Sequence, residues 1–151
     1  MSELLEKARS YEAKKIAATD KESKPLFHIS APAGWINDPN GFSVYNGKIH
    51  LFYQYYPYLR EWGPMHWGHS TTSDMIKWEQ LPCVLAPDEE YDKKGCFSGS
   101  AIEADGKHVL VYTGVTRIKL PDGSEQERQN QCIAFGDGLN YVKHELSLIH
   151  I

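Results

Sequence analysis

The chain has 151 residues, of which 41% are hydrophobic and 24% are charged, and its formal net charge is −4. These values are typical of a globular domain with a hydrophobic core, and they give no reason to expect nucleic acid or a membrane as a partner. The three cysteines, an odd number without close spacing, argue against a disulfide framework or a zinc site. Residues 1–15 carry frequent charges and no apolar segment of a secretory signal, so the sequence predicts a reduced, cytoplasmic protein.

Residues 2–18 are predicted to form a helix with Ser2 as its N-cap. The apolar positions near one face of this helix are Leu4, Leu5, Ala8, Tyr11 and Ala18. The polar segment 19–24 ends at Pro25 and is typical of a linker. Residues 1–24 are therefore predicted to be a helical leader and linker.

After the linker, short aromatic and β-branched runs alternate with Gly, Pro, Asn and Asp, which is typical of an all-β fold. Two of these runs form predicted hairpins, each built from a strand, a tight turn and a strand. The first joins Phe42–Tyr45 to Ile49–Tyr55 through Asn46-Gly47, and the second joins Ala101–Ala104 to His108–Thr113 through Asp105-Gly106. Asn-Gly favours a type I′ turn because both central residues must tolerate a positive φ.

The two hairpins are offset by about 59 residues, and a second pair of similar segments, Ser73–Trp78 and Gly136–Tyr141, is offset by about 63. The difference predicts a few inserted residues, which we assign to the polar segment 119–129, expected to be a loop. A repeat of about 60 residues with two hairpins is typical of a four-stranded propeller blade, although a meander sandwich gives similar strands. We therefore expect residues 25–145 to contain about two blades.

The segment Trp35-Ile36-Asn37-Asp38-Pro39-Asn40-Gly41 precedes the first hairpin. Asp-Pro-Asn-Gly is a strong turn signal, so Asp38 by itself would be interpreted as a turn former. Three further groups downstream combine aromatic residues, small residues and neutral hydrogen-bonding side chains. They are Phe52-Tyr53-Gln54-Tyr55, Trp62-Gly63-Pro64-Met65-His66-Trp67-Gly68-His69 and Gly95-Cys96-Phe97-Ser98-Gly99-Ser100-Ala101.

In their order and separations, these four motifs resemble those of the invertase and sucrose-6-phosphate hydrolase (β-fructofuranosidase) family of retaining glycoside hydrolases, from about residue 28 to residue 145. The resemblance implies an all-β fold, the N-terminal part of a five-bladed β-propeller preceded by a short helix. It implies that Asp38 is the nucleophile that forms a fructosyl-enzyme intermediate. The implied substrate-binding residues are Trp35, which supports the first motif, Asn37 and Gln54, which hold fructose hydroxyls, Trp62, which walls the pocket, and Phe97 and Ser98, which contact the fructosyl unit.

A retaining glycosidase needs a second carboxyl group about 5 Å from the nucleophile. In the family this group lies in a Glu-Cys motif, and a further acid lies in an Arg-Asp-Pro motif; the sequence contains neither. Glu145 is the nearest candidate by position, but it lacks the Cys partner and is rejected. Residues 146–151 carry no turn or strand punctuation, although a short natural strand remains the alternative. We therefore expect an inactive N-terminal fragment with a non-native tail at residues 146–151.

The sequence thus predicts hydrolysis of the fructosyl bond of sucrose or sucrose 6-phosphate, a small-molecule sugar. A fructan hydrolase of the same family stays open, and so does a non-catalytic, lectin-like fructose-binding module, although the intact Asp38 argues against the latter. No metal or organic cofactor is expected. His66 and His69 are disfavoured as a metal-binding pair, because they lie three apart on a predicted strand and would point to opposite faces. The oligomeric state is not indicated by the sequence.

Overall fold

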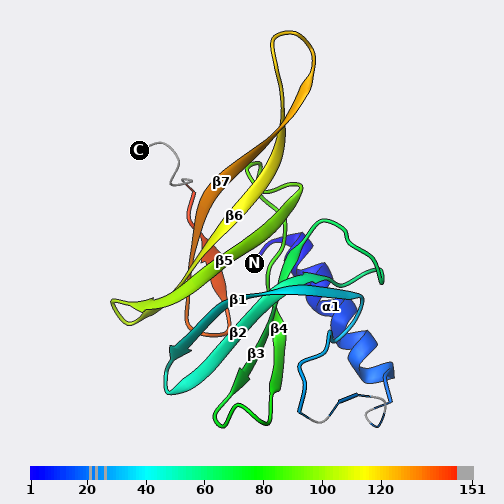
Figure 1. The fold of residues 1–151 in the computed structure, drawn as a ribbon, viewed down its shortest axis with the longest axis vertical. Coiled ribbons are helices and arrows are strands. Elements are labelled where there is room, and N and C mark those ends of the chain that lie inside the picture. The colour runs from blue at the N-terminus through cyan, green and yellow to red at the C-terminus, as the bar shows by residue number, and fades with distance from the viewer. Residues whose placement is uncertain (21, 23, 26, 146–151) are drawn as a thin grey trace.

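The computed structural model describes residues 1–20, 22, 24, 25 and 27–145 (Figure 1). Within them the chain forms helix α1 (Glu3–Ala18) followed by eight strands. The strands are β1 (Trp35–Tyr45), β2 (Lys48–Tyr56), β3 (His66–Thr72), β4 (Glu79–Leu85), β5 (Gly95–Ala104), β6 (Lys107–Lys119), β7 (Glu125–Gly136) and β8 (Tyr141–Lys143). They build two antiparallel four-stranded sheets, β1–β4 and β5–β8, each in chain order. The predicted all-β fold after a short helix is confirmed, while the predicted tail at 146–151 lies outside the described residues.

Both predicted hairpin turns have the backbone geometry that their sequences favour. The φ angles are 50° at Asn46 and 71° at Gly47, and 49° at Asp105 and 71° at Gly106. Positive φ at both central residues is the requirement of a type I′ turn, whose twist matches that of the flanking strands. These two turns confirm the repeated hairpin.

The second repeated segment also recurs as one local structure. Asp74 Oδ1 accepts hydrogen bonds from the N–H groups two and three residues further on, at 2.9 and 2.8 Å. Asp137 Oδ1 does the same at 2.9 and 2.7 Å. In both cases these backbone hydrogen bonds lower the pKa of the carboxyl group. The same capped turn therefore joins the third and fourth strands of each sheet.

The predicted loop at 119–129 is wrong. Strands β6 and β7 stay paired as far as Lys119 and Glu125, so that only residues 120–124 form the turn. Figure 1 shows this two-stranded ribbon projecting beyond the other strands of its sheet. Opposite charges stabilise it, because Arg117 pairs with Glu125 at 3.4 Å. The polar composition of this segment predicts a loop, but cross-strand pairing extends the hairpin through most of it.

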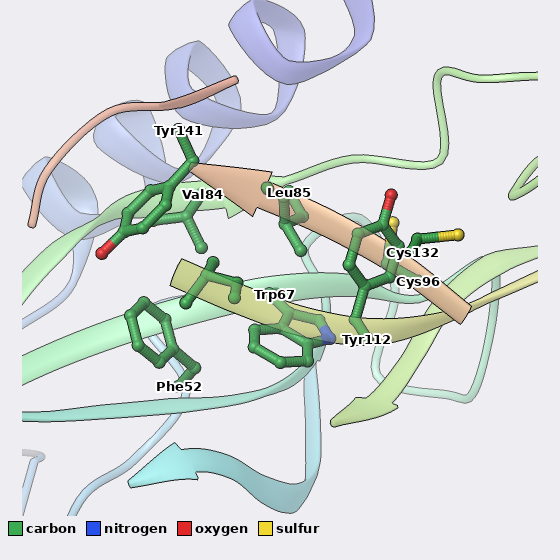
Figure 2. Packing of buried hydrophobic residues seen from close by; sticks show 10 residues of the cluster. Phe52, Trp67, Val84, Leu85, Cys96, Tyr112, Cys132 and Tyr141 are labelled. Carbon is green, nitrogen blue, oxygen red and sulfur yellow. The ribbon is translucent and has the colours of Figure 1, made fainter. Parts of the chain in front are cut away.

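The main core lies between the two sheets, and Figure 2 shows its side chains facing one another. Sheet β1–β4 contributes Phe52, Trp67, Val84 and Leu85, and sheet β5–β8 contributes Cys96, Leu110, Tyr112, Cys132, Ala134 and Tyr141. All of these residues are buried. Burial of this much aromatic and aliphatic surface is the main force that holds the sheets face to face.

Helix α1 covers the free edge of β4 (Figure 1). Ser2 caps the helix by accepting the N–H of Leu5 at 3.2 Å, as predicted. The buried positions are Leu5, Ala8 and Glu12, whereas Leu4 and Ala18 of the predicted apolar face are exposed. The reason is that positions 5, 8 and 12 form one stripe along the helix, and this stripe faces the sheet.

Two side chains of α1 hold the backbone of β4 at a single residue. The Arg9 guanidinium donates to the carbonyl of Cys83 at 2.7 Å, and Glu12 Oε1 accepts the N–H of Cys83, also at 2.7 Å. Arg9 also donates at 3.0 Å to Asn140, in the turn between β7 and β8 of the second sheet. The helix therefore provides hydrogen-bond partners for backbone groups of the edge strand β4 that would otherwise be unpaired. It also links both sheets.

A buried ionic network fixes the last strand to the segment before β5. Lys143 Nζ on β8 forms ion pairs with Asp88 and Asp92. Asp92 is fully buried and also accepts the hydroxyl of Tyr112 at 2.8 Å. Because each of these charges has an oppositely charged partner, their mutual attraction offsets the free energy of removing them from water.

Three histidines lie together beside Phe52 and Tyr141 of the core. His50 Nδ1 and His69 Nε2 are 2.9 Å apart, and the rings of His50 and His108 lie at 4.9 Å. Tyr141 and Ser43 bind the two ring nitrogens of His108 at 2.7 and 2.9 Å. Burial lowers the pKa of all three histidines, that of His108 to about 4. They are therefore neutral at physiological pH.

Candidate active site

Asp38 and Ser98 meet where the first strands of the two sheets begin. Strands β1 and β5 lie side by side (Figure 1), and the Ser98 hydroxyl donates to Asp38 Oδ2 at 3.1 Å across them. Both side chains are exposed. The contact joins residues from two motifs that are 60 positions apart in the sequence.

Each of these two residues lies in a β-bulge. On β1, Ile36 pairs with Tyr55 and Pro39 with Tyr53, so Asn37 and Asp38 together oppose a single residue of β2. On β5 the register shifts around Ser98. A bulge adds a residue to one strand and redirects its side chain, and bulges occur often at functional sites. Pro39 has no backbone N–H, so the interrupted strand pairing leaves no donor without a partner at this position.

Gly41 lets the two first strands approach each other. Its φ is +52°, and a Cβ there would lie 2.7 Å from the Phe52 ring and 3.1 Å from Ala101 Cβ on β5. A larger residue would separate β1 from β5. The glycine of the first motif is therefore needed for the contact between Asp38 and Ser98.

Side chains of the first sheet hold the start of β5 in place. Gln54 Nε2 donates to the carbonyl of Cys96 at 3.0 Å, and Trp67 Nε1 donates to the carbonyl of Phe97 at 3.1 Å. The buried Asn40 amide lies between the two sheets. In one orientation its Oδ1 accepts the N–H of Gly99 at 3.3 Å. In the opposite orientation its oxygen accepts from Gln54 Nε2 at 3.0 Å instead. These contacts fix the backbone on both sides of Ser98.

Aromatic side chains flank the pair. Trp62 is 55% exposed, and its ring meets the Phe97 ring edge to face, with centroids 6.0 Å apart. Trp35 Nε1 donates to Asn37 Oδ1 at 2.9 Å, which orients the amide next to Asp38. Exposed aromatic faces next to an exposed carboxylate and amide suit a polar ligand with apolar faces, such as a sugar.

The predicted site residues contact one another in separate pairs and do not form one continuous group. Asp38 contacts Ser98, Trp62 contacts Phe97, and Trp35 contacts Asn37. Gln54 differs, because it is only 3% exposed and its amide is engaged with the main chain of β5. The roles of all these residues stay predictions.

Sequence reasoning missed the positioning roles of Asn40 and Trp67. Both lie inside motifs that were recognised, but the motif pattern alone does not separate a residue that contacts a ligand from one that supports the backbone. Among the described residues there is no group of three or more His, Cys, Asp or Glu side chains that could hold a metal ion. Nor is any helix of this described part long and apolar enough to cross a membrane.

Residues 28–150 match the glycosyl hydrolases family 32 N-terminal domain. The chain belongs to this family. Over 125 residues it is 46% identical to a sucrose-6-phosphate hydrolase of Escherichia coli, an alignment that covers 82% of this chain and 26% of that protein. It is 48% identical over 145 residues to a levanase of Bacillus subtilis, covering 93% and 21%. The resemblance of the motifs to this family is thereby confirmed.

Solved structures of family 32 share the arrangement of the two sheets. A β-fructofuranosidase from Bombyx mori superposes with a TM-score of 0.80 at 44% identity, covering 93% of this chain and 29% of that one. A sucrose-6-phosphate hydrolase from Lactobacillus gasseri gives 0.78 at 34% identity, covering 93% and 28%. The chain thus spans about a quarter of the length of these family 32 relatives.

Proposed function

We propose that the protein hydrolyses the fructosyl bond of sucrose or sucrose 6-phosphate with net retention, and that Asp38 is the nucleophile. The contact between Asp38 and Ser98 supports this most directly, because it brings a carboxylate and a hydroxyl from two family motifs to the adjoining starts of β1 and β5. The sucrose-6-phosphate hydrolases among the relatives support the choice of substrate.

In this mechanism an Asp38 oxygen bonds to the anomeric carbon of the fructosyl unit as the bond to the leaving sugar oxygen breaks. A second carboxyl group gives its proton to that oxygen, and then removes a proton from the water that releases fructose from Asp38. Two successive inversions at one carbon give retention. We place this second group outside the 151 residues, and we expect these residues alone to release no fructose.

The remaining roles follow from position. The Ser98 hydroxyl orients the carboxylate and is available to a fructosyl hydroxyl. Trp62 and Phe97 wall the site, and Asn37 is held by Trp35 so that its amide can contact the sugar. Gln54 is nearly fully buried and one of its N–H groups binds the Cys96 carbonyl, so its second N–H and its amide oxygen are the groups that can contact the sugar. The two sheets are, in this proposal, the first blades of a five-bladed propeller.

A fructan is the second candidate substrate. It is favoured by the levanase of Bacillus subtilis and by a fructan 6-exohydrolase of Beta vulgaris, each 48% identical over the aligned residues. Both candidates use the same reaction at the fructosyl unit and differ in the group that leaves.

The experiment uses the full-length protein that contains this chain. Initial rates with sucrose, sucrose 6-phosphate and levan give kcat/KM for each, and NMR of the first-formed fructose gives the stereochemistry. We expect Asp38→Asn to abolish turnover, and Asp105→Asn, the same change in an exposed turn, to leave it unaltered. An inverted product, or turnover that survives in Asp38→Asn, would refute the assignment.

A further inference from the structure

A cavity of about 370 Å³ lies between the second half of α1, the segment before β1 and the loop after β2. Its walls include Tyr11 and Lys15 of the helix, Gly34 before β1, and Tyr58 and Arg60 of the loop. The volume is within the range of sites for small molecules. Neither Asp38 nor Ser98 lines it.

The charge of this cavity is opposite to that of the chain. Lys15, Lys24 and Arg60 line it, and its described lining residues include no Asp or Glu, although the chain has 20 acidic and 16 basic residues. Within the described part of the chain, none of the three cations takes part in an ion pair. Three unpaired cations around one cavity repel each other, and a bound anion removes that repulsion.

The end of α1 does not oppose an anion as strongly as a bare helix C-terminus would. Thr19 donates its hydroxyl to the carbonyl of Lys15 at 2.8 Å and its N–H to the carbonyl of Ile16 at 3.2 Å. These bonds occupy carbonyl oxygens that would otherwise carry the negative end of the helix dipole.

The cavity also has features that suit a sugar. The Tyr11 and Tyr58 rings pack edge to face with centroids 5.1 Å apart, and Lys15 Nζ lies 5.4 Å from the Tyr11 ring centre. The Ser30 side chain adds a hydroxyl to the lining. Rings, hydroxyls and cations together match a ligand with apolar faces, hydroxyl groups and one concentrated negative charge.

We propose that this cavity binds the phosphate monoester of a hexose, with Lys15, Lys24 and Arg60 around the phosphate and the tyrosines against the sugar. The site is additional to the one around Asp38, and the proposal does not depend on the proposed function.

The test is calorimetric titration of the chain with glucose 6-phosphate, with glucose and inorganic phosphate as separate arms. We expect glucose 6-phosphate to bind at least tenfold more tightly than either. Lys15→Gln and Arg60→Gln should each weaken binding about tenfold or more, as expected for a lost charge-assisted hydrogen bond. Lys14→Gln, the matched change one residue away and outside the cavity lining, should leave it within about twofold.

Amide chemical shifts in an NMR titration locate the ligand and separate this site from the other one. We expect shifts at Thr19, Ser30 and Gly34, and none at Asp38 or Ser98. Shifts confined to Asp38 and Ser98, no binding at millimolar concentration, equal affinity for inorganic phosphate, or equal weakening by Lys14→Gln would each overturn the proposal.

Discussion

Glu12 offers a direct test of how α1 is held on the sheets. Its side chain is 3% exposed; Oε1 accepts the N–H of Cys83, whereas Oε2 has no hydrogen-bond partner in the described part of the chain. Burial raises the pKa of Glu12 to about 7, even though the hydrogen bond from the Cys83 N–H and the positive charge of Arg9 act in the opposite direction. The folded protein therefore favours the protonated carboxyl group.

The sign of the pH effect follows from this difference. In the unfolded chain the pKa of Glu12 is near 4.5, so the folded state holds this proton more tightly. The stabilisation is complete below pH 4.5 and is lost as pH rises through 7. A shift from 4.5 to about 7 corresponds to about 3 kcal/mol of unfolding free energy.

The perturbation is Glu12→Gln, which keeps the shape and the acceptor for Cys83 and removes the titration. We expect it to match the wild type at pH 4.5 and to be more stable by up to about 3 kcal/mol at pH 8. Urea unfolding followed by tryptophan fluorescence, repeated from pH 4.5 to 8, measures this difference. The buried histidines titrate in both proteins with the opposite sign, so the difference between the two proteins isolates Glu12.

Glu103→Gln, the same substitution at an exposed strand position, is the matched control. If Glu12→Gln shifts the unfolding free energy equally at pH 4.5 and pH 8, the carboxyl group does not titrate with a raised pKa. The account of the buried contact would then be wrong.

Three further changes test the packing. Gly41→Ala forces a Cβ to 2.7 Å from the Phe52 ring at a φ of +52°, and urea unfolding should show a loss of about 1–3 kcal/mol; an unchanged midpoint would contradict the close approach of the first strands. Lys143→Met leaves the buried Asp92 without its ion-pair partner, and calorimetry at pH 7 should show a loss of about 3–5 kcal/mol; a loss below about 1 kcal/mol would argue against the ionic network. Asn40→Ala removes the acceptor for the main chain of β5, and we expect a loss of about 1–3 kcal/mol together with faster amide exchange at Gly99; unaltered exchange would show that Asn40 does not hold β5.

The sequence by itself determined the features that depend on a few neighbouring residues. The Asn46-Gly47 and Asp105-Gly106 turns were predicted because positive φ at two positions restricts the residues allowed there. The Ser2 cap and the start of α1 follow from the same kind of local hydrogen bonding. The family was identified from short motifs because their order and spacing carry much more information than composition.

Only the tertiary structure decided features that depend on residues far apart in the chain. The burial of Glu12 arises because the backbone of Cys83, 71 positions away, supplies a partner, and an acidic residue in a helix does not indicate this. The ribbon of β6 and β7 required knowledge of cross-strand pairing. Likewise, the contact of Asp38 with Ser98 depends on two bulges and on Gly41, which together set the approach of two strands from separate sheets. Local preferences fix turns and caps, but the free energy of packing between sheets fixes which side chains meet.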